Sequence, residues 1–173
     1  MPQQNIILTG FMGTGKTTLG QLLAEKIGYQ FVDTDALIEQ QTGKSITKIF
    51  ATQGEKAFRQ LETELVKKLA DKSGLVIATG GGLVLNPVNI TELSRTGQIF
   101  CLTASAEEIF QRVTQQDNNR PLLQEEDPLQ KIVALLKQRD PIYQQFPQIS
   151  TSGTTAEKLV EKISGLIQNE SSS

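Results

Sequence analysis

The sequence predicts an α/β fold in which helices cover both faces of a five-stranded parallel sheet. Short apolar runs alternate along the chain with segments whose apolar residues recur at helical spacing. Successive positions of the runs are apolar, as is typical of strands buried on both faces of a parallel sheet. The 173 residues match the length of one domain with a sizeable core, so we expect a single domain over residues 1–173.

The individual elements follow from these runs. Strands are expected over residues 5–8, 29–32, 75–78, 99–102 and 147–150. Four sets of residues mark the buried faces of helices: Leu19, Leu22, Leu23 and Ile27; Phe58, Leu61, Leu65, Val66 and Leu69; Leu129, Ile132, Val133 and Leu136; and Leu159, Val160, Ile163 and Leu166.

Two helix starts carry recognisable signals. Asp127 followed by Pro128 predicts an N-cap and a proline at the first helical position. Thr154 and Glu157 have the spacing of a capping box. The polar stretch 114–127 is expected to be a long, mobile surface loop that acts as a lid, and residues 169–173 a disordered tail.

The composition excludes several classes of function. A net charge of −2 provides no broad basic surface for nucleic acids or anionic membranes. The chain has no histidine, which removes imidazole catalysis and histidine-bound metals. No apolar stretch approaches the roughly 18 residues of a membrane span, and the N-terminus lacks the features of a signal peptide. The single cysteine, Cys101, is expected in the core, and we expect a cytoplasmic protein.

The stretch "GFMGTGKTT" (10–18) lies between the first predicted strand and the first predicted helix. It matches the phosphate-binding loop pattern, in which glycines let backbone N–H groups curve around a phosphate at a helix N-terminus. Lys16 is expected to reach the β- and γ-phosphates, and the Thr17 hydroxyl to bind Mg²⁺. The sequence therefore predicts a site for a nucleoside triphosphate.

Two carboxylates follow the second predicted strand in "FVDTDALIE". Asp33 and Asp35 are expected at the carboxyl edge of the sheet, where ligands bind in open α/β folds. Asp33 suits a role beside Mg²⁺, and Asp35 suits hydrogen bonds to a hydroxyl acceptor and removal of its proton. The alternative is that one of them only caps the following helix.

Arg59 and Glu62 are three residues apart on a predicted helix in "GEKAFRQLE". One interpretation is a surface ion pair of small energetic value. The other is that Glu62 orients the guanidinium for a substrate carboxylate.

Glycines and arginines mark three further places. Residues 80–82 are three successive glycines after a strand, which indicates a tight turn or a backbone that lies against a ligand. Arg120 lies inside the polar loop in "NNRPLL", and Arg139 at the end of a helix in "KQRDPIY". Each arginine taken alone is also consistent with a solvated surface residue.

Taken together, the order GFMGTGKTT, FVDTD, GEKAFRQLE, TGGG, NRPLL and R-x-P-x-Y resembles the shikimate kinase family over essentially the whole chain. The resemblance implies a three-layer P-loop kinase fold of the nucleoside-monophosphate-kinase type, with a five-stranded parallel sheet. It also implies transfer of the γ-phosphoryl group of ATP to the 3-hydroxyl of shikimate in aromatic amino-acid synthesis. We expect ATP and shikimate as small-molecule partners, Mg²⁺ as cofactor, and a monomer.

The resemblance also implies roles for residues. Lys16, Asp35 and Arg120 are the expected catalytic residues, and Arg120 is the lid arginine that contacts the ATP phosphates. Thr17 and Asp33 are the expected metal residues. The expected nucleotide-binding set is Gly13, Thr14, Gly15, Lys16, Thr17, Thr18 and Arg120. The expected shikimate-binding set is Asp35, Arg59, Gly81 and Arg139, with the two arginines on the carboxylate.

One departure from the family pattern concerns the adenine. The family often has an arginine seven residues before the lid arginine, and that position is Val113 here. Arg112 is adjacent, but about 100° away around a helix.

Three alternatives stand beside shikimate kinase. A gluconate-type kinase shares the phosphate loop, but the combination of Phe58-Arg59, the three glycines at 80–82 and Arg139 favours shikimate as the acceptor. A GTPase switch requires an N/T-K-x-D motif, which "TKIF" and "DKSG" do not supply. An inactive relative is disfavoured because every motif residue is intact.

Overall fold

The computed structural model of the chain describes residues 3–116 and 126–172. Its strands are β1 (Asn5–Gly10), β2 (Gln30–Asp33), β3 (Leu75–Ala78), β4 (Gly97–Thr103) and β5 (Gln148–Ser150). Its helices are α1 (Lys16–Ile27), α2 (Thr34–Thr42), α3 (Ile46–Ala70), the short 3₁₀ helix η1 (Leu83–Leu85), α4 (Pro87–Thr96), α5 (Ala106–Gln116), α6 (Pro128–Tyr143) and α7 (Ala156–Ser171).

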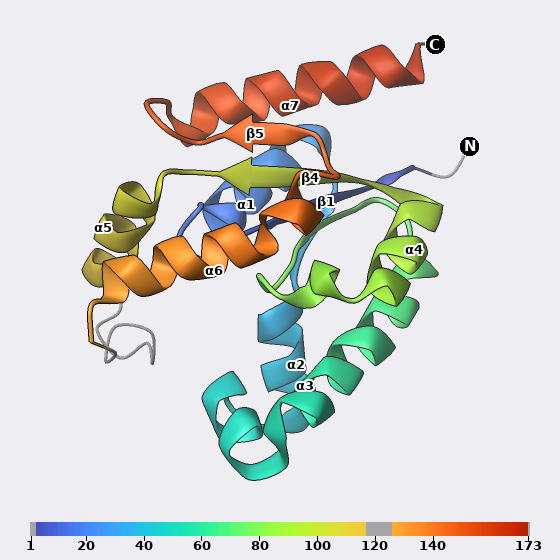
Figure 1. The fold of residues 1–173 in the computed structure, drawn as a ribbon. Coiled ribbons are helices and arrows are strands. Elements are labelled where there is room, and N and C mark those ends of the chain that lie inside the picture. Colours follow the sequence, from blue (N-terminus) through green and yellow to red (C-terminus); the bar gives the residue numbers. More distant parts are fainter. Residues whose placement is uncertain (1–2, 117–125, 173) are drawn as a thin grey trace.

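The five strands form one parallel sheet in the order β2-β3-β1-β4-β5 (Figure 1). Each predicted strand overlaps an observed one, so the predicted α/β fold with a five-stranded parallel sheet is confirmed. All strands run in one direction, so the loops that follow β1, β2 and β3 meet at the same edge of the sheet.

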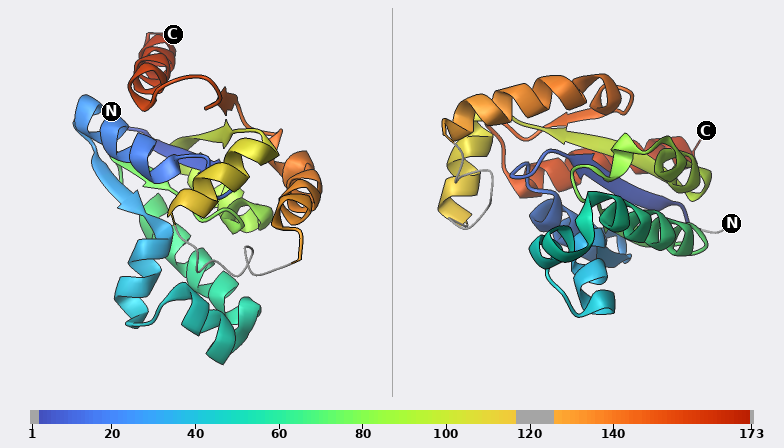
Figure 2. Two further views of the ribbon diagram at one scale, coloured as in Figure 1. Left: turned by 90° about the vertical axis from the view of Figure 1, so that its left-hand side faces the viewer. Right: turned by 60° about the horizontal axis from the view of Figure 1, so that its bottom comes forward.

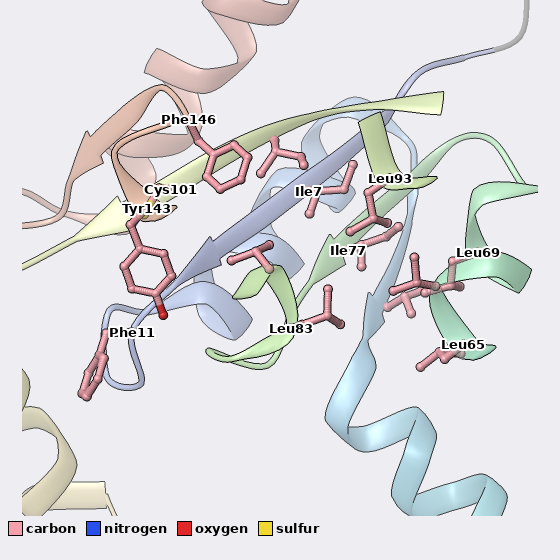
Figure 3. Close-up of a cluster of buried hydrophobic side chains, with 14 of the residues drawn as sticks. Ile7, Phe11, Leu65, Leu69, Ile77, Leu83, Leu93, Cys101, Tyr143 and Phe146 are labelled. Carbon is pink, nitrogen blue, oxygen red and sulfur yellow. The ribbon is translucent and has the colours of Figure 1, made fainter. Parts of the chain in front are cut away.

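Helices cover the sheet on both faces because neighbouring residues of each strand point to opposite sides. In β1, Ile7 belongs to a core cluster shared with α3, α4, α5 and α6. Ile6 and Leu8 belong to a second cluster shared with α1 and α7. Figure 3 shows the first cluster, in which Cys101 is fully buried as predicted.

The helices α2 and α3 extend the molecule beyond the sheet, as both views of Figure 2 show. Gly54 (φ 86°, ψ 168°) interrupts the helical geometry inside α3. The part of α3 after Gly54 packs its apolar face, which includes Phe58, Leu65 and Leu69, against the sheet. This arrangement brings the first turns after Gly54 towards the edge at which β2 and β3 end.

The loop and the C-terminal tail differ from the prediction in their bounds. α5 continues to Gln116, so the predicted loop 114–127 begins later than expected, and residues 117–125 lie outside the described part of the chain. α7 continues to Ser171, where residues 169–173 were expected to be disordered. The Ser171 hydroxyl donates to the Ile167 carbonyl at 3.1 Å, which helps to extend this polar last turn.

Of the two predicted helix starts, one is confirmed and one is wrong by a residue. Asp127 caps α6, with its Oδ1 accepting a hydrogen bond from the Gln130 N–H at 3.3 Å. The cap of α7 is Thr155, which accepts from the Lys158 N–H at 3.3 Å, and not Thr154. Two adjacent threonines can both cap a helix, so the spacing to Glu157 does not decide between them. No helix in the described residues is long and apolar enough to cross a membrane.

Two helical glycines form a matched pair for testing the packing of α1 on the sheet. A β-carbon at Gly20 of α1 would lie 2.6 Å from Cε2 of Phe31, whereas a β-carbon at Gly165 of α7 would meet nothing within 4 Å. We expect Gly165→Ala to stabilise the fold by roughly 0.5–1 kcal/mol, and Gly20→Ala to destabilise it by roughly 1–3 kcal/mol. Denaturant unfolding measures both values, and a stabilising effect of Gly20→Ala would contradict the packing of α1 against Phe31.

Candidate active site

The phosphate loop joins the end of β1 to the start of α1. Gly13 (φ 76°) and Gly15 (φ 92°) have left-handed backbone conformations, which residues with side chains rarely adopt. The Thr14 hydroxyl donates to the Phe11 carbonyl at 2.7 Å and closes the loop internally. Gly15 caps α1 without a side chain, so the helix presents its N-terminal backbone N–H groups at the loop, as an anion site requires.

Lys16 is folded over this loop. Its Nζ donates to the carbonyls of Gly10 at 2.6 Å and Phe11 at 2.9 Å. The lysine side chain is thus held at the place where the backbone turns, next to the position predicted for phosphates.

A cleft of about 460 Å³ opens beside the loop. Several predicted nucleotide, metal and acceptor residues line it, together with residues that the sequence did not single out. The lining residues that matter here are Gly13, Thr14, Gly15, Lys16, Thr17, Thr18, Asp33, Asp35, Gly80, Gly81, Arg112, Thr151 and Thr154. The structure therefore brings the phosphate loop, both aspartates and Gly81 together at one edge of the sheet.

Asp33 combines the two roles that the sequence left open. Its Oδ1 accepts from the Ala36 N–H at 3.0 Å and caps α2. Its Oδ2 accepts from the Thr17 hydroxyl at 3.1 Å. Two oxygen donors of the kind that Mg²⁺ prefers therefore lie together at the phosphate loop. Within the described residues, no group of three or more His, Cys, Asp or Glu side chains is arranged to hold a metal ion.

Asp35 lies deeper in the cleft and does not cap α2. Its Oδ1 is buried and has no hydrogen-bond partner within the described part of the chain. Burial, and next the negative charge of Asp33, raise the pKa of the Asp35 carboxyl above its ordinary value, although the nearby Lys16 opposes the shift. An unpartnered buried carboxylate oxygen that faces a cleft is suited to accept a hydrogen bond from a ligand.

The glycine turn at residues 80–82 lies against three side chains from three different helices. A β-carbon at Gly80 would lie 2.7 Å from Oδ1 of Asp35 in α2, and one at Gly81 3.1 Å from Nη1 of Arg139 in α6. At Gly82 it would lie 2.6 Å from Nη2 of Arg59 in α3. None of the three glycines has a positive φ. Glycine is required here for space, so the turn can approach these groups closely.

The ion pair of Arg59 with Glu62 is buried on one side. Arg59 Nη1 lies 2.6 Å from Oε1 of Glu62, whose side chain is only 1% exposed, and Arg59 also contacts the exposed Glu55 at 3.4 Å. The interpretation as a surface ion pair is therefore wrong. The sequence contained a signal for this: Glu62 is four residues after Phe58 and three before Leu65, on the buried face of the helix.

Burial raises the pKa of Glu62 to about 7, even though the hydrogen bond from Arg59 lowers it. The second oxygen of this carboxyl, Oε2, has no hydrogen-bond partner among the described residues. Glu62 thus titrates near neutral pH beside the arginine that faces the glycine turn.

Arg112 is a site residue that the sequence did not assign. It lines the cleft, and its Nη1 donates to the Gly13 carbonyl at 3.2 Å and to the Thr151 hydroxyl at 3.0 Å. Val113 is fully buried, and its Cγ2 is the atom nearest to a β-carbon built at Gly13. Val113 lies four residues after Ile109, which is also buried, and this helical spacing predicts that position 113 belongs to the core. Arg120 lies outside the described residues.

Comparison with known proteins places this arrangement in a family. The sequence model of the family described as Shikimate kinase matches residues 12–168. A shikimate kinase from Thermodesulfovibrio yellowstonii is 49% identical over 161 residues, which cover 92% of each chain.

The chain belongs to the shikimate kinase family. The predicted family, fold and activity as an ATP-dependent shikimate kinase are thereby confirmed. A solved structure titled "Shikimate kinase from Acinetobacter baumannii in complex with shikimate" matches with a TM-score of 0.89 and 43% identity, over 97% of this chain and 94% of that one. A gluconokinase structure from Sinorhizobium meliloti matches with a TM-score of 0.60 and 17% identity, over 97% of this chain and 95% of that one, which is a likeness of fold alone.

The raised pKa of Glu62 predicts how the stability of this shikimate kinase varies with pH. The folded state holds the Glu62 proton up to about pH 7, whereas the ordinary value for the unfolded chain is 4.5. The retained proton contributes to the free energy of unfolding, by at most about 3 kcal/mol. This contribution is fully present below pH 4.5 and is lost as the pH rises to 7. Removing the titrating group removes this loss, so the stability of Glu62→Gln relative to the parent should rise across that interval.

Thermal unfolding from pH 4.5 to 8 measures this difference. Glu55→Gln is the matched control, because Glu55 also contacts Arg59 but has an exposed side chain. We expect the difference between Glu62→Gln and the parent to grow with pH and become constant above pH 7, whereas Glu55→Gln should follow the parent. Parallel pH profiles for Glu62→Gln and the parent would contradict the assignment.

Proposed function

We propose that the chain transfers the γ-phosphoryl group of ATP to the 3-hydroxyl of shikimate in the cleft beside the phosphate loop. One observation carries this proposal: Asp35, Arg59 and Arg139 converge on the glycine turn at residues 80–82, next to the loop. Shikimate carries hydroxyls and a carboxylate, which need a hydrogen-bond acceptor and cations. The complex of the Acinetobacter baumannii relative with shikimate supports the choice of acceptor.

On the nucleotide side, the backbone from Gly13 to Thr18 and the Lys16 ammonium bind the phosphates. Thr17 and Asp33, which are hydrogen-bonded to each other, are the residues to hold Mg²⁺. When bound, the ion neutralises negative charge on the phosphate oxygens. Loops of this type contribute mainly by fixing the position of the transferred group.

On the acceptor side, Arg59 and Arg139 bind the carboxylate of shikimate, and the Gly81 backbone bounds the ring. Asp35 accepts a hydrogen bond from the acceptor hydroxyl and takes its proton as the oxygen attacks phosphorus. Its raised pKa suits this role, because a carboxylate with a higher proton affinity is a stronger base. Glu62 holds the Arg59 guanidinium in a fixed orientation through its 2.6 Å contact.

Other parts of the proposal rest on the family resemblance. Arg120 contacts the ATP phosphates, and the lid about residues 114–127 closes over both substrates to exclude water, which would otherwise accept the phosphoryl group. We also propose that the chain acts as a cytoplasmic monomer.

The test of the function is an ADP-release assay with a panel of acceptors. Shikimate, gluconate, a nucleoside monophosphate and buffer alone are compared at equal ATP concentration, with and without Mg²⁺ removal by EDTA. We expect ADP release to depend on both shikimate and Mg²⁺. Equal turnover with gluconate, or ATP hydrolysis that is independent of any acceptor, would refute the proposal.

Asp35→Asn tests the proposed base because it keeps the size of the side chain and removes its charge. We expect kcat to fall roughly 10²–10⁴-fold, with ADP affinity nearly unchanged because Lys16 and Thr17 are intact. Asp71→Asn, at an exposed surface position, is the matched control. A loss of kcat below about tenfold would remove Asp35 from the role of base.

Arg112→Ala tests the contact between the phosphate loop and the segment at Thr151. Loss of charge-assisted hydrogen bonds of roughly 1.5–3 kcal/mol should raise the KM for ATP about tenfold or more. The KM for shikimate should change less than about twofold, because Arg112 lies on the nucleotide side. Arg95→Ala, at a surface position that forms only exposed ion pairs, is the control. An equal rise in both KM values would contradict this placement.

A further inference from the structure

Tyr143 lies one helical turn after Arg139 on α6, so both side chains leave the same face of the helix. The tyrosine is only 4% exposed and belongs to the first core cluster. In Figure 3 its ring lies among Cys101, Phe11 and the end of β1, with the hydroxyl at the border of the cluster. The ring is thus fixed by packing, and its one polar atom is aimed at the site.

The hydroxyl of Tyr143 has two partners. It donates to the Gly81 carbonyl at 2.6 Å, and it accepts from Nη1 of Arg139 at 3.5 Å. The first bond fixes the direction of the O–H group, so a lone pair of the oxygen remains for the guanidinium. Burial raises the pKa of the phenol, and the hydroxyl therefore stays protonated and keeps this polarity at neutral pH.

Phe11 bounds the guanidinium on another side. The Cζ atom of Arg139 lies 5.2 Å from the centre of the Phe11 ring, within the range of a cation–π contact. Phe11 is itself fixed, because it is 1% exposed and its carbonyl accepts from Lys16 and Thr14. The arginine is therefore held between a ring of the phosphate loop and the hydroxyl of its own helix.

Arg139 and Arg59 are held in different ways. Arg59 is paired with Glu62 and Glu55. In the described ranges, no carboxylate oxygen lies within 4.0 Å of an Arg139 nitrogen. A guanidinium held by neutral groups keeps its positive charge for an anionic ligand, but it needs those groups to keep its orientation.

We propose that Tyr143 is a positioning residue that orients Arg139 for the carboxylate of the acceptor. The Gly81 carbonyl anchors the tyrosine hydroxyl, and the hydroxyl anchors the guanidinium. This inference rests on the proposed role of Arg139 in binding the substrate carboxylate. It assigns Tyr143 no contact with the substrate.

Tyr143→Phe tests the inference, because it keeps the ring in the core and removes only the hydroxyl. We expect the KM for shikimate to rise about three- to tenfold, the range for loss of one hydrogen bond. The KM for ATP should change less than about twofold, since the nucleotide side is untouched. Tyr29→Phe removes the same group from a ring that packs against the opposite core cluster, and it should leave both KM values unchanged.

A double-mutant cycle separates orientation of Arg139 from a general structural effect. If Tyr143 acts through the arginine, adding Tyr143→Phe to Arg139→Ala should raise the shikimate KM less than about twofold further. Multiplicative effects of the two substitutions, or an unchanged shikimate KM in Tyr143→Phe alone, would overturn the inference. A normal shikimate KM in Arg139→Ala alone would instead refute the proposed role of Arg139 itself.

Discussion

The close approach of three side chains to one glycine turn is the constraint on which the site depends. At residues 80–82 the backbone lies against Asp35, Arg139 and Arg59, and any β-carbon would come within about 3 Å of them. These side chains belong to α2, α6 and α3, which are far apart in the sequence. A turn without side chains at the end of β3 therefore lets three helices present charged groups to one small volume beside the phosphate loop.

The charges in this volume are balanced unevenly. Burial raises the pKa of Glu62, although its pairing with Arg59 opposes the shift, and the 2.6 Å contact holds the Arg59 guanidinium. Arg139 is held by the ring of Phe11 and the hydroxyl of Tyr143, and not by a carboxylate within the described residues. The guanidinium of Arg139 therefore faces the glycine turn without a carboxylate partner in the described ranges, in a protein whose net charge is −2.

The sheet and the phosphate loop could be predicted because their signals are local: apolar runs, helix starts, and glycines at a fixed spacing. Asp33 shows the limit of such signals, because an aspartate at this position suits either a helix cap or a site beside the metal. In the structure it caps α2 and also accepts from Thr17, so the sequence alone could not choose between the two. Helical spacing from buried neighbours predicts the burial of Glu62 and of Val113, but the charge of Glu62 and the family pattern at position 113 favour other roles for them. The packing of Tyr143 on Gly81 joins residues 62 positions apart, and no local pattern predicts it.

The most direct test of the central claim is the affinity of Gly82→Ala for its two substrates. Isothermal titration calorimetry measures the binding of shikimate alone and of ADP with Mg²⁺ to the variant and the parent. The methyl group would displace the Arg59 guanidinium, so shikimate affinity should fall at least about tenfold. ADP affinity should stay within about twofold, because the phosphate loop is untouched. Unchanged shikimate affinity in a folded variant would contradict the claim that this turn sets the geometry of the acceptor site.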